Sequence, residues 1–329
     1  MTARERAPRG VRLLHALQKE PDWPSLTPED LVVVRDAANR KASARLARVI
    51  TGSPDRGAAI DWREVVLPDR VLPVRVYRPV RDGATPLPLI VHVHGGGFVG
   101  TATQCDWANS HLAARLPALV VSVEHRLLAP GTPLAAAVDD GWDVLRHVVA
   151  HAEDWGIDPA RVAVAGESTG GLIAAMAAIR AAATEFPLRA QILVNPAVDL
   201  TATMFDYPSM TEHADSPMLT RPRLDLFQRL AVPPGSDARA VSPLYAELAG
   251  LAPALVLIPT VDPVAGQGRR YAERLRESGT PVRLAEHPGA PHAFITLPGL
   301  VSQAKAARAQ MVEFLTDRLV AHGSPRQRR

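Results

Sequence analysis

The residue best placed for chemistry in this sequence is Ser168, in the pentapeptide Gly166-Glu-Ser-Thr-Gly170. A short apolar run (Val162–Ala165) precedes it and an alanine-rich run follows, which predicts a strand, a sharp turn and a helix. Glycines two positions away on each side allow a tight turn that holds the serine hydroxyl above the sheet. A hydroxyl held beside a helix N-terminus predicts a nucleophile for acyl transfer.

A nucleophile of this kind needs donors for a developing oxyanion. The run His94-Gly-Gly-Gly-Phe98 directly follows the apolar stretch Leu87–Val93, at the expected carboxyl end of a buried strand, where ligands bind in open α/β sheets. Three successive glycines leave backbone N–H groups uncovered. The expected donors are the N–H groups of Gly96, Gly97 and Thr169, with His94 and Gly95 as the rest of the loop.

A general base must also lie within reach of Ser168. His292 belongs to a turn-rich loop between the last predicted strand and the last predicted helix, so its ring can turn over a neighbouring strand end. His287, at the end of that strand, is the alternative. His213 and His322 lie in an insertion and in the C-terminal tail.

An acid that orients the imidazole is expected at another strand end. Asp262 follows the strand predicted over Ala254–Pro259, and Asp199 after Ala190–Asn195 is the alternative. Asp262 gives the chain order Ser, Asp, His that accompanies a nucleophile elbow. Its expected task is to hold the imidazole tautomer and to stabilise the imidazolium.

Other chemistries have weak support in the sequence. The single cysteine, Cys105, excludes an internal disulfide framework. His92 and His94 could ligate a metal, but no third ligand is evident, and the phosphate-binding and dinucleotide-binding glycine motifs are absent. The sequence therefore predicts no metal and no cofactor.

The surrounding pattern predicts the elements that position these residues. Residues 1–50 read as amphipathic helices, the second from about Pro28 to Val49, and two antiparallel strands follow around Trp62–Leu67 and Leu72–Tyr77. Strands and helices then alternate. This predicts an α/β fold with an open, mostly parallel, doubly wound sheet of about eight strands.

The predicted organisation has a core interrupted once. N-terminal helices occupy 1–50, the core 51–198 and 241–322, an insertion above the sheet 199–240, and a disordered basic tail 323–329. The insertion holds aromatic and methionine side chains among turn residues and one predicted helix, Arg221–Leu230. The side chains expected to line a substrate pocket are Phe98, Phe205, Met210, Phe227 and Phe294.

The composition is that of a soluble globular protein, with 47% hydrophobic and 22% charged residues and a formal net charge of +3. Arginines are scattered, which argues against nucleic acid or a membrane surface as a partner. The first ten residues lack an apolar signal-peptide core, and no apolar run reaches membrane-spanning length. Cytoplasmic residence is the resulting expectation.

In combination, these stretches resemble the hormone-sensitive-lipase-like family of α/β-hydrolase esterases, also called bacterial family IV. The residues that carry the resemblance are Val76-Tyr-Arg-Pro79, His94-Gly-Gly-Gly-Phe98, Arg126-Leu-Leu-Ala-Pro130, Val138-Asp-Asp140, Gly166-Glu-Ser-Thr-Gly-Gly171, Asp262-Pro263 and His292-Ala-Phe294. The resemblance implies the α/β-hydrolase fold, with the N-terminal helices (1–50) and the insertion (199–240) as a two-part cap over an acyl pocket. It also implies hydrolysis of short- to medium-chain carboxylic esters, and often a homodimer.

Several positions depart from the family pattern. Glu167 and Thr169 stand where aspartate and alanine are usual, and Val264-Ala-Gly-Gln267 replaces a charged run after Asp262. Two alternatives stay open: a non-hydrolytic small-molecule binder on the same fold, and an acetyl-ester or amide hydrolase of secondary metabolism.

Overall fold

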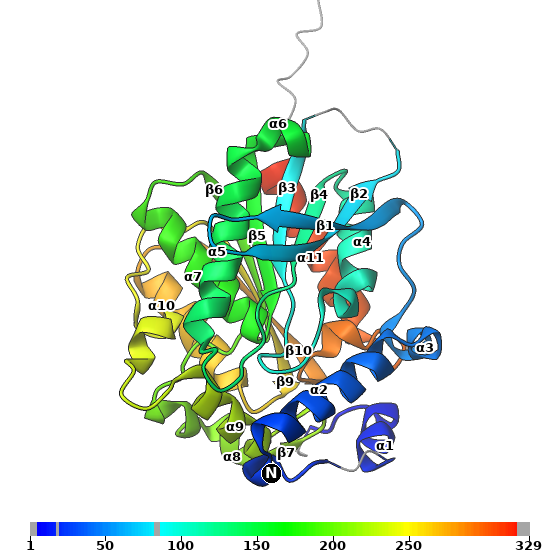
Figure 1. Ribbon diagram of the computed structural model, residues 1–329, viewed down its shortest axis with the longest axis vertical. Helices are drawn as coiled ribbons and strands as arrows, with labels where there is room; N and C mark the ends of the chain where they lie inside the picture. Colours follow the sequence, from blue (N-terminus) through cyan, green and yellow to red (C-terminus); the bar gives the residue numbers. More distant parts are fainter. Residues whose placement is uncertain (1–4, 18–19, 82–85, 321–329) are drawn as a thin grey trace, which may run out of the picture.

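A computed structural model describes residues 5–17, 20–81 and 86–320 (Figure 1). Its centre is an eight-stranded sheet with the order β1-β2-β4-β3-β5-β6-β9-β10. Only β2 runs antiparallel to its neighbours β1 and β4. The remaining pairs are parallel, so the predicted mostly parallel eight-stranded sheet is confirmed.

The strands are β1 (Ala58–Val66), β2 (Val71–Pro79), β3 (Leu87–Val93), β4 (Leu119–Val123), β5 (Ile157–Glu167), β6 (Leu188–Val194), β9 (Ala254–Val261) and β10 (Val282–Pro291), with a small separate pair, β7 (Asp215–Ser216) and β8 (Leu219–Thr220). Every residue of β3 and β4 is buried, as their continuous apolar sequences require.

Helices cover both faces of this sheet (Figure 1). The helices are α1 (Arg9–Leu17), α2 (Pro28–Ser43), α3 (Arg48–Thr51), α4 (Asp106–Arg115), α5 (Leu134–Ala150), α6 (Ala152–Trp155), α7 (Thr169–Ala183), α8 (Pro208–Glu212), α9 (Arg221–Ala231), α10 (Ala265–Glu277) and α11 (Gln303–Leu319). One core packs α5, α7 and α10 on the sheet, and the other packs α4 and α11 on the opposite face.

The N-terminal helices and the insertion lie together at the carboxyl ends of the parallel strands, at the bottom of Figure 1. The turn Trp23–Ser25 contacts α9, although the two segments are about 200 residues apart in sequence. A cavity of about 520 Å³ lies between residues 5–15 of the first segment and residues 211–217 of the second. The two segments predicted to form the cap thus contact each other.

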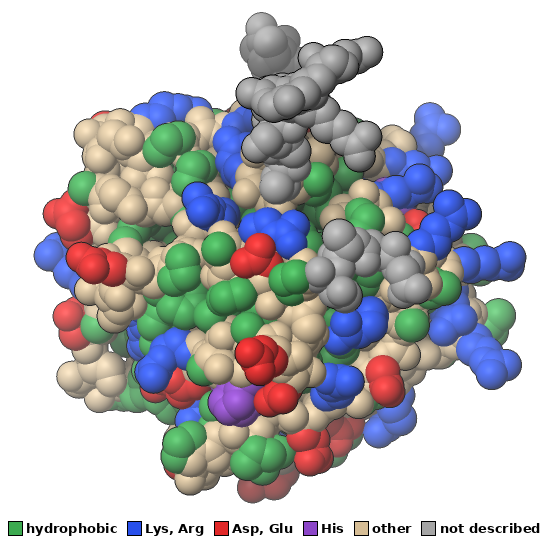
Figure 2. Space-filling model, turned by 90° about the horizontal axis from the view of Figure 1, so that it is seen from above, with side chains coloured by type: hydrophobic (Ala, Val, Ile, Leu, Met, Phe, Trp, Pro, Cys, Tyr) green, Lys and Arg blue, Asp and Glu red, His purple; other side chains and the backbone are tan. Residues whose placement is uncertain are grey.

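The opposite end of the molecule, seen in Figure 2, presents basic and acidic side chains interspersed with hydrophobic ones. Within the described part of the chain, no helix combines the length and apolarity needed to cross a membrane. The tail predicted at 323–329 lies outside the described residues.

Two boundaries differ from those expected from sequence. The second N-terminal helix ends at Ser43, not near Val49, because residues 41–46 are exposed and no packing holds them in a longer helix. Strand β10 continues past Glu286 to Pro291, because Pro291 resumes pairing with Val261 after a register shift. Helix α4 was not anticipated from the sequence.

Candidate active site

Ser168 lies at the turn between β5 and α7, in a backbone conformation that its neighbours impose. Its φ is 52° and its ψ is −119°, a region that costs energy for a residue with a side chain. A Cβ on Gly166 would lie 2.1 Å from the Gly170 carbonyl oxygen, and one on Gly170 would lie 2.1 Å from the Val93 carbonyl oxygen. Both glycines are therefore required by close backbone approach.

Two hydrogen bonds join Ser168, His292 and Asp262. The Ser168 Oγ lies 2.9 Å from the His292 Nε2, and the His292 Nδ1 lies 2.8 Å from the Asp262 Oδ2. When the His292 Nδ1–H donates a hydrogen bond to Asp262, the neutral imidazole has a lone pair on Nε2, which can accept a hydrogen bond from the Ser168 hydroxyl. The structure thus brings together the three residues predicted from the strand ends.

The alternative acid, Asp199, accepts hydrogen bonds from two threonines at the start of the insertion. Its Oδ1 accepts bonds from the Thr201 N–H and hydroxyl, at 2.9 and 2.7 Å, and its Oδ2 accepts from the Thr203 hydroxyl at 2.8 Å. Asp262 is also fully buried, and its second oxygen accepts the Val264 N–H at 3.0 Å. Asp199 therefore organises the start of the insertion.

The alternative base, His287, points into the core. Its ring packs against Phe294 at 4.9 Å between centroids, and burial lowers its pKa. Phe294 is fully buried in the core that contains α4 and α11. The structure therefore places Phe294, expected in the pocket, on the other side of the sheet from Phe98 and Phe227.

The glycine loop after β3 faces the elbow. Among the described residues, no hydrogen-bond acceptor is found for the N–H groups of Gly96, Gly97 or Thr169. Thr169 is the first residue of α7, where an N–H has no partner within its helix. Gly96 has a φ of 90°, which a residue with a side chain rarely adopts.

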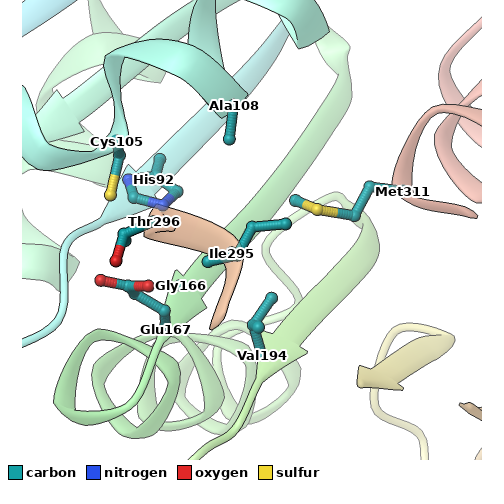
Figure 3. A pocket seen from close by; sticks show the side chains of 9 residues that line it. All are labelled: His92, Cys105, Ala108, Gly166, Glu167, Val194, Ile295, Thr296 and Met311. Carbon is teal, nitrogen blue, oxygen red and sulfur yellow. The ribbon is translucent and has the colours of Figure 1, made fainter. Parts of the chain in front are cut away.

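Glu167 holds this loop in place. Its Oε1 accepts the Gln104 side-chain amide at 2.6 Å and the Gly95 N–H at 3.3 Å, while the same amide donates to the Gly95 carbonyl at 3.1 Å. Figure 3 shows the Glu167 carboxyl group directed toward Thr296, in a small cavity that His92 and Cys105 also line. Burial raises the pKa of Glu167, which favours its neutral form.

Three buried histidines around the glycine loop, His92, His94 and His125, contact neighbouring residues of the core. The His94 ring stacks on His125 at 4.3 Å, and its Nδ1 bonds to the Gly95 carbonyl. His92 bonds to Ser122. Burial lowers the pKa values of His92 to about 3 and of His94 and His125 to about 4, so the three rings are neutral near pH 7.

The remaining residues predicted for the pocket divide into two groups. Phe98 and Phe227 lie over the glycine loop, since a Cβ on Gly97 would come within 2.4 Å of the Phe227 ring. Met210 is buried in a separate cluster that includes Val264, and Phe205 packs against that cluster under the Arg221 guanidinium. Sequence reasoning missed Trp23, whose ring lies 5.6 Å from Phe98.

Two serines of the insertion hold the acid loop, and sequence reasoning missed both. The Ser209 hydroxyl donates to the Pro263 carbonyl at 2.7 Å and accepts the Gly266 N–H at 3.1 Å. The Ser216 hydroxyl donates to the Val261 carbonyl at 2.7 Å. These contacts fix the loop that lacks the usual charged run, and no local sequence signal distinguishes these serines from others.

The chain is similar in sequence to known esterases. The chain is 39% identical to the carboxylesterase NlhH of Mycobacterium tuberculosis over 72% of this chain and 75% of that one. It is 33% identical to an ethyl acetate hydrolase of Pseudomonas putida, covering 86% and 90%.

Among solved structures, an esterase from Pyrobaculum calidifontis superposes with a TM-score of 0.82 at 30% identity, covering 94% of this chain and 96% of the other. An α/β-hydrolase enzyme from the metagenome of Lake Arreo gives a TM-score of 0.84 at 29% identity, with the same coverage. A family model described as the α/β-hydrolase fold matches residues 90–296. The chain belongs to the α/β-hydrolase family.

Proposed function

We propose that the protein is a serine esterase that hydrolyses short- to medium-chain carboxylic esters. The observation that carries this proposal is the bonded series from Ser168 through His292 to Asp262. The relatives support it, because they include a carboxylesterase and an ethyl acetate hydrolase. The serine hydroxyl supplies the nucleophile, and the imidazole supplies the base.

In the acylation step, the Ser168 Oγ attacks the ester carbonyl carbon while the His292 Nε2 takes its proton. The carbonyl oxygen becomes an oxyanion, which accepts hydrogen bonds from the free N–H groups of Gly96, Gly97 and Thr169. The C–O bond to the alcohol then breaks, and His292 gives its proton to the leaving oxygen. Asp262 keeps Nδ1 protonated and stabilises the imidazolium.

Water completes the cycle. It attacks the acyl carbon and gives one proton to the His292 Nε2, and a second tetrahedral intermediate forms. That intermediate collapses to the free acid as His292 returns a proton to the Ser168 Oγ. The nucleophile and the base are then in their starting states.

Replacement of Ser168 with alanine tests the assignment. Turnover of p-nitrophenyl butyrate is expected to fall to the background rate, and labelling by a fluorophosphonate is expected to disappear. Thermal unfolding should change little, because the hydroxyl bonds only to His292 among the described residues. Unchanged turnover in a pure, folded variant would refute the role of Ser168.

A non-hydrolytic binder is less well supported, because binding alone does not require a base bonded to a serine and an acid. Rates with a series of esters of increasing acyl-chain length give the chain-length preference, and a matching amide substrate separates ester from amide hydrolysis.

Homodimer formation and cytoplasmic residence remain predictions, and analytical ultracentrifugation tests the first.

A further inference from the structure

Arg223 lies in the cap above the glycine loop. It precedes Phe227 by one turn of α9, and residues four apart share a helix face. Phe227 packs on Gly97, and the Arg223 guanidinium carbon lies 5.6 Å from the centre of the Phe98 ring. The Trp23 ring is 5.4 Å from the same guanidinium carbon, and the Trp23 and Phe98 rings lie 5.6 Å from each other. The cation therefore lies beside an adjacent pair of aromatic rings, one of which, Phe98, directly follows the glycine loop that faces Ser168.

This cation is only partly satisfied by the protein. Arg75 illustrates the usual arrangement, because its Nε and Nη2 donate to the two oxygens of the Asp106 carboxylate at 2.6 and 2.8 Å. Arg223 makes one hydrogen bond, from Nη1 to the Met218 carbonyl at 3.1 Å, and forms no ion pair with any carboxylate in the described ranges. A guanidinium has five N–H donors, so several remain for another acceptor.

Glu20 is the acidic group that influences Arg223. Its carboxylate accepts the Trp23 indole N–H and the Thr220 hydroxyl, each at 3.1 Å. Its charge favours the guanidinium, but burial has the larger effect and lowers the Arg223 pKa. The hydrogen bonds from Trp23 and Thr220 thus hold the Glu20 carboxylate in place. Its negative charge partly offsets the positive charge of Arg223, although the two groups form no salt bridge.

From this geometry we infer that Arg223 selects esters that carry a carboxylate. The inference rests on the proposed ester hydrolysis. An ester carbonyl held at Gly97 would lie next to Phe227, and the Arg223 backbone is four residues, about 6 Å of helix rise, from Phe227 along α9. A carboxylate a few bonds from the ester can therefore reach the guanidinium and accept two parallel hydrogen bonds, the strongest geometry for this pair.

Two substrate series test the inference in the intact protein. The first comprises monoethyl esters of succinic, glutaric and adipic acids, with ethyl esters of monocarboxylic acids of equal length as neutral counterparts. The second comprises acetate esters of ω-hydroxy acids and of the matching simple alcohols. Initial rates by pH-stat titration give kcat/KM for each pair, and the series that responds shows which side of the ester carries the carboxylate.

Arg223→Gln is expected to lower kcat/KM about tenfold to a hundredfold for the anionic esters of at least one series. Neutral esters should change less than about threefold. Arg223→Lys should restore part of the loss, because it keeps the charge but not the bidentate geometry. Glu20→Gln should change the anionic esters in the opposite direction, because it removes a competing negative charge.

Arg229→Gln is the matched control, since Arg229 is an exposed arginine of the same helix. It should leave the ratio of anionic to neutral kcat/KM unchanged. Equal losses for anionic and neutral esters in Arg223→Gln, or no loss in either, would overturn the inference while the proposed hydrolysis stands.

Binding separates the two proposals further. Calorimetry with Ser168→Ala measures the affinity for monoethyl adipate without turnover, in the presence and absence of the Arg223→Gln change. Weaker binding of monoethyl adipate by the variant that lacks Arg223 supports the role of Arg223. If the wild-type protein hydrolyses no ester, that separate result refutes the proposed function and leaves the role of Arg223 standing. Equal binding by both variants would overturn the inference.

Discussion

Replacement of Asp262 with asparagine tests how the base is oriented. Both oxygens of Asp262 accept hydrogen bonds, one from the His292 Nδ1–H at 2.8 Å and one from the Val264 N–H at 3.0 Å. Asparagine has one acceptor oxygen, so it satisfies only one of these donors. If that oxygen faces His292, the new NH₂ group opposes the Val264 N–H, at a cost of about 1–3 kcal/mol.

The less costly orientation therefore turns the NH₂ group toward His292. The imidazole must then accept at Nδ1 and carry its proton on Nε2, where it no longer accepts the Ser168 proton at 2.9 Å. Loss of the correct tautomer lowers kcat by about 10⁴-fold in serine hydrolases of this type. That corresponds to about 5.4 kcal/mol of transition-state stabilisation at 1.36 kcal/mol per factor of ten.

The assay is kcat for p-nitrophenyl butyrate, with Asp199→Asn as the matched control. Both aspartates are fully buried and hydrogen-bonded, but only Asp262 contacts His292. Asp199→Asn is expected to lower the melting temperature and to leave kcat within about tenfold. A 10⁴-fold loss in Asp199→Asn together with near-normal turnover in Asp262→Asn would refute this account.

Two further predictions concern the glycine loop. Gly97→Ala places a methyl group 2.4 Å from the Phe227 ring, so kcat/KM should fall by at least tenfold. The double variant Gly97→Ala/Phe227→Leu should recover part of this loss, because leucine leaves more room for the methyl group. Absence of recovery would contradict a steric cause. Burial raises the pKa of Glu167 in the folded protein above that of a carboxyl group in the unfolded chain. At pH values between these two pKa values, the folded protein binds more protons than the unfolded chain. The free energy of unfolding therefore falls as pH rises through this range. Glu167→Gln keeps an acceptor for Gln104 and Gly95 and should flatten that decline, measured by urea unfolding from pH 5 to 8; an unchanged slope would show that another group causes it.

Much of the sheet could be predicted because its strands are continuous apolar runs between turn residues. Strand β3 begins and ends at the predicted residues, since Leu87–Val93 is apolar apart from His92, and His94 and three glycines follow it. Ser168, Asp262 and His292 could be predicted as neighbours because parallel strands place their carboxyl ends at one edge.

Side-chain packing was harder to predict than topology. Phe294 follows the candidate base by two residues, yet a 3-10 turn directs it into the core beside His287. The contact of Trp23 with Arg223 joins segments about 200 residues apart, and neither side chain has a local pattern that marks it. Such pairings depend on how the cap docks, which hydrophobic periodicity does not determine.

The separation of the two cap segments has a consequence during synthesis on the ribosome. Glu20 and Thr220, which are bonded in the folded cap, are 200 residues apart in sequence, so translation at 5–20 residues per second separates their emergence by about 10–40 s. His292 follows Ser168 by 124 residues and emerges later still. A nascent chain therefore carries the nucleophile for several seconds before it has a base, and its first cap helices wait unpaired for most of translation.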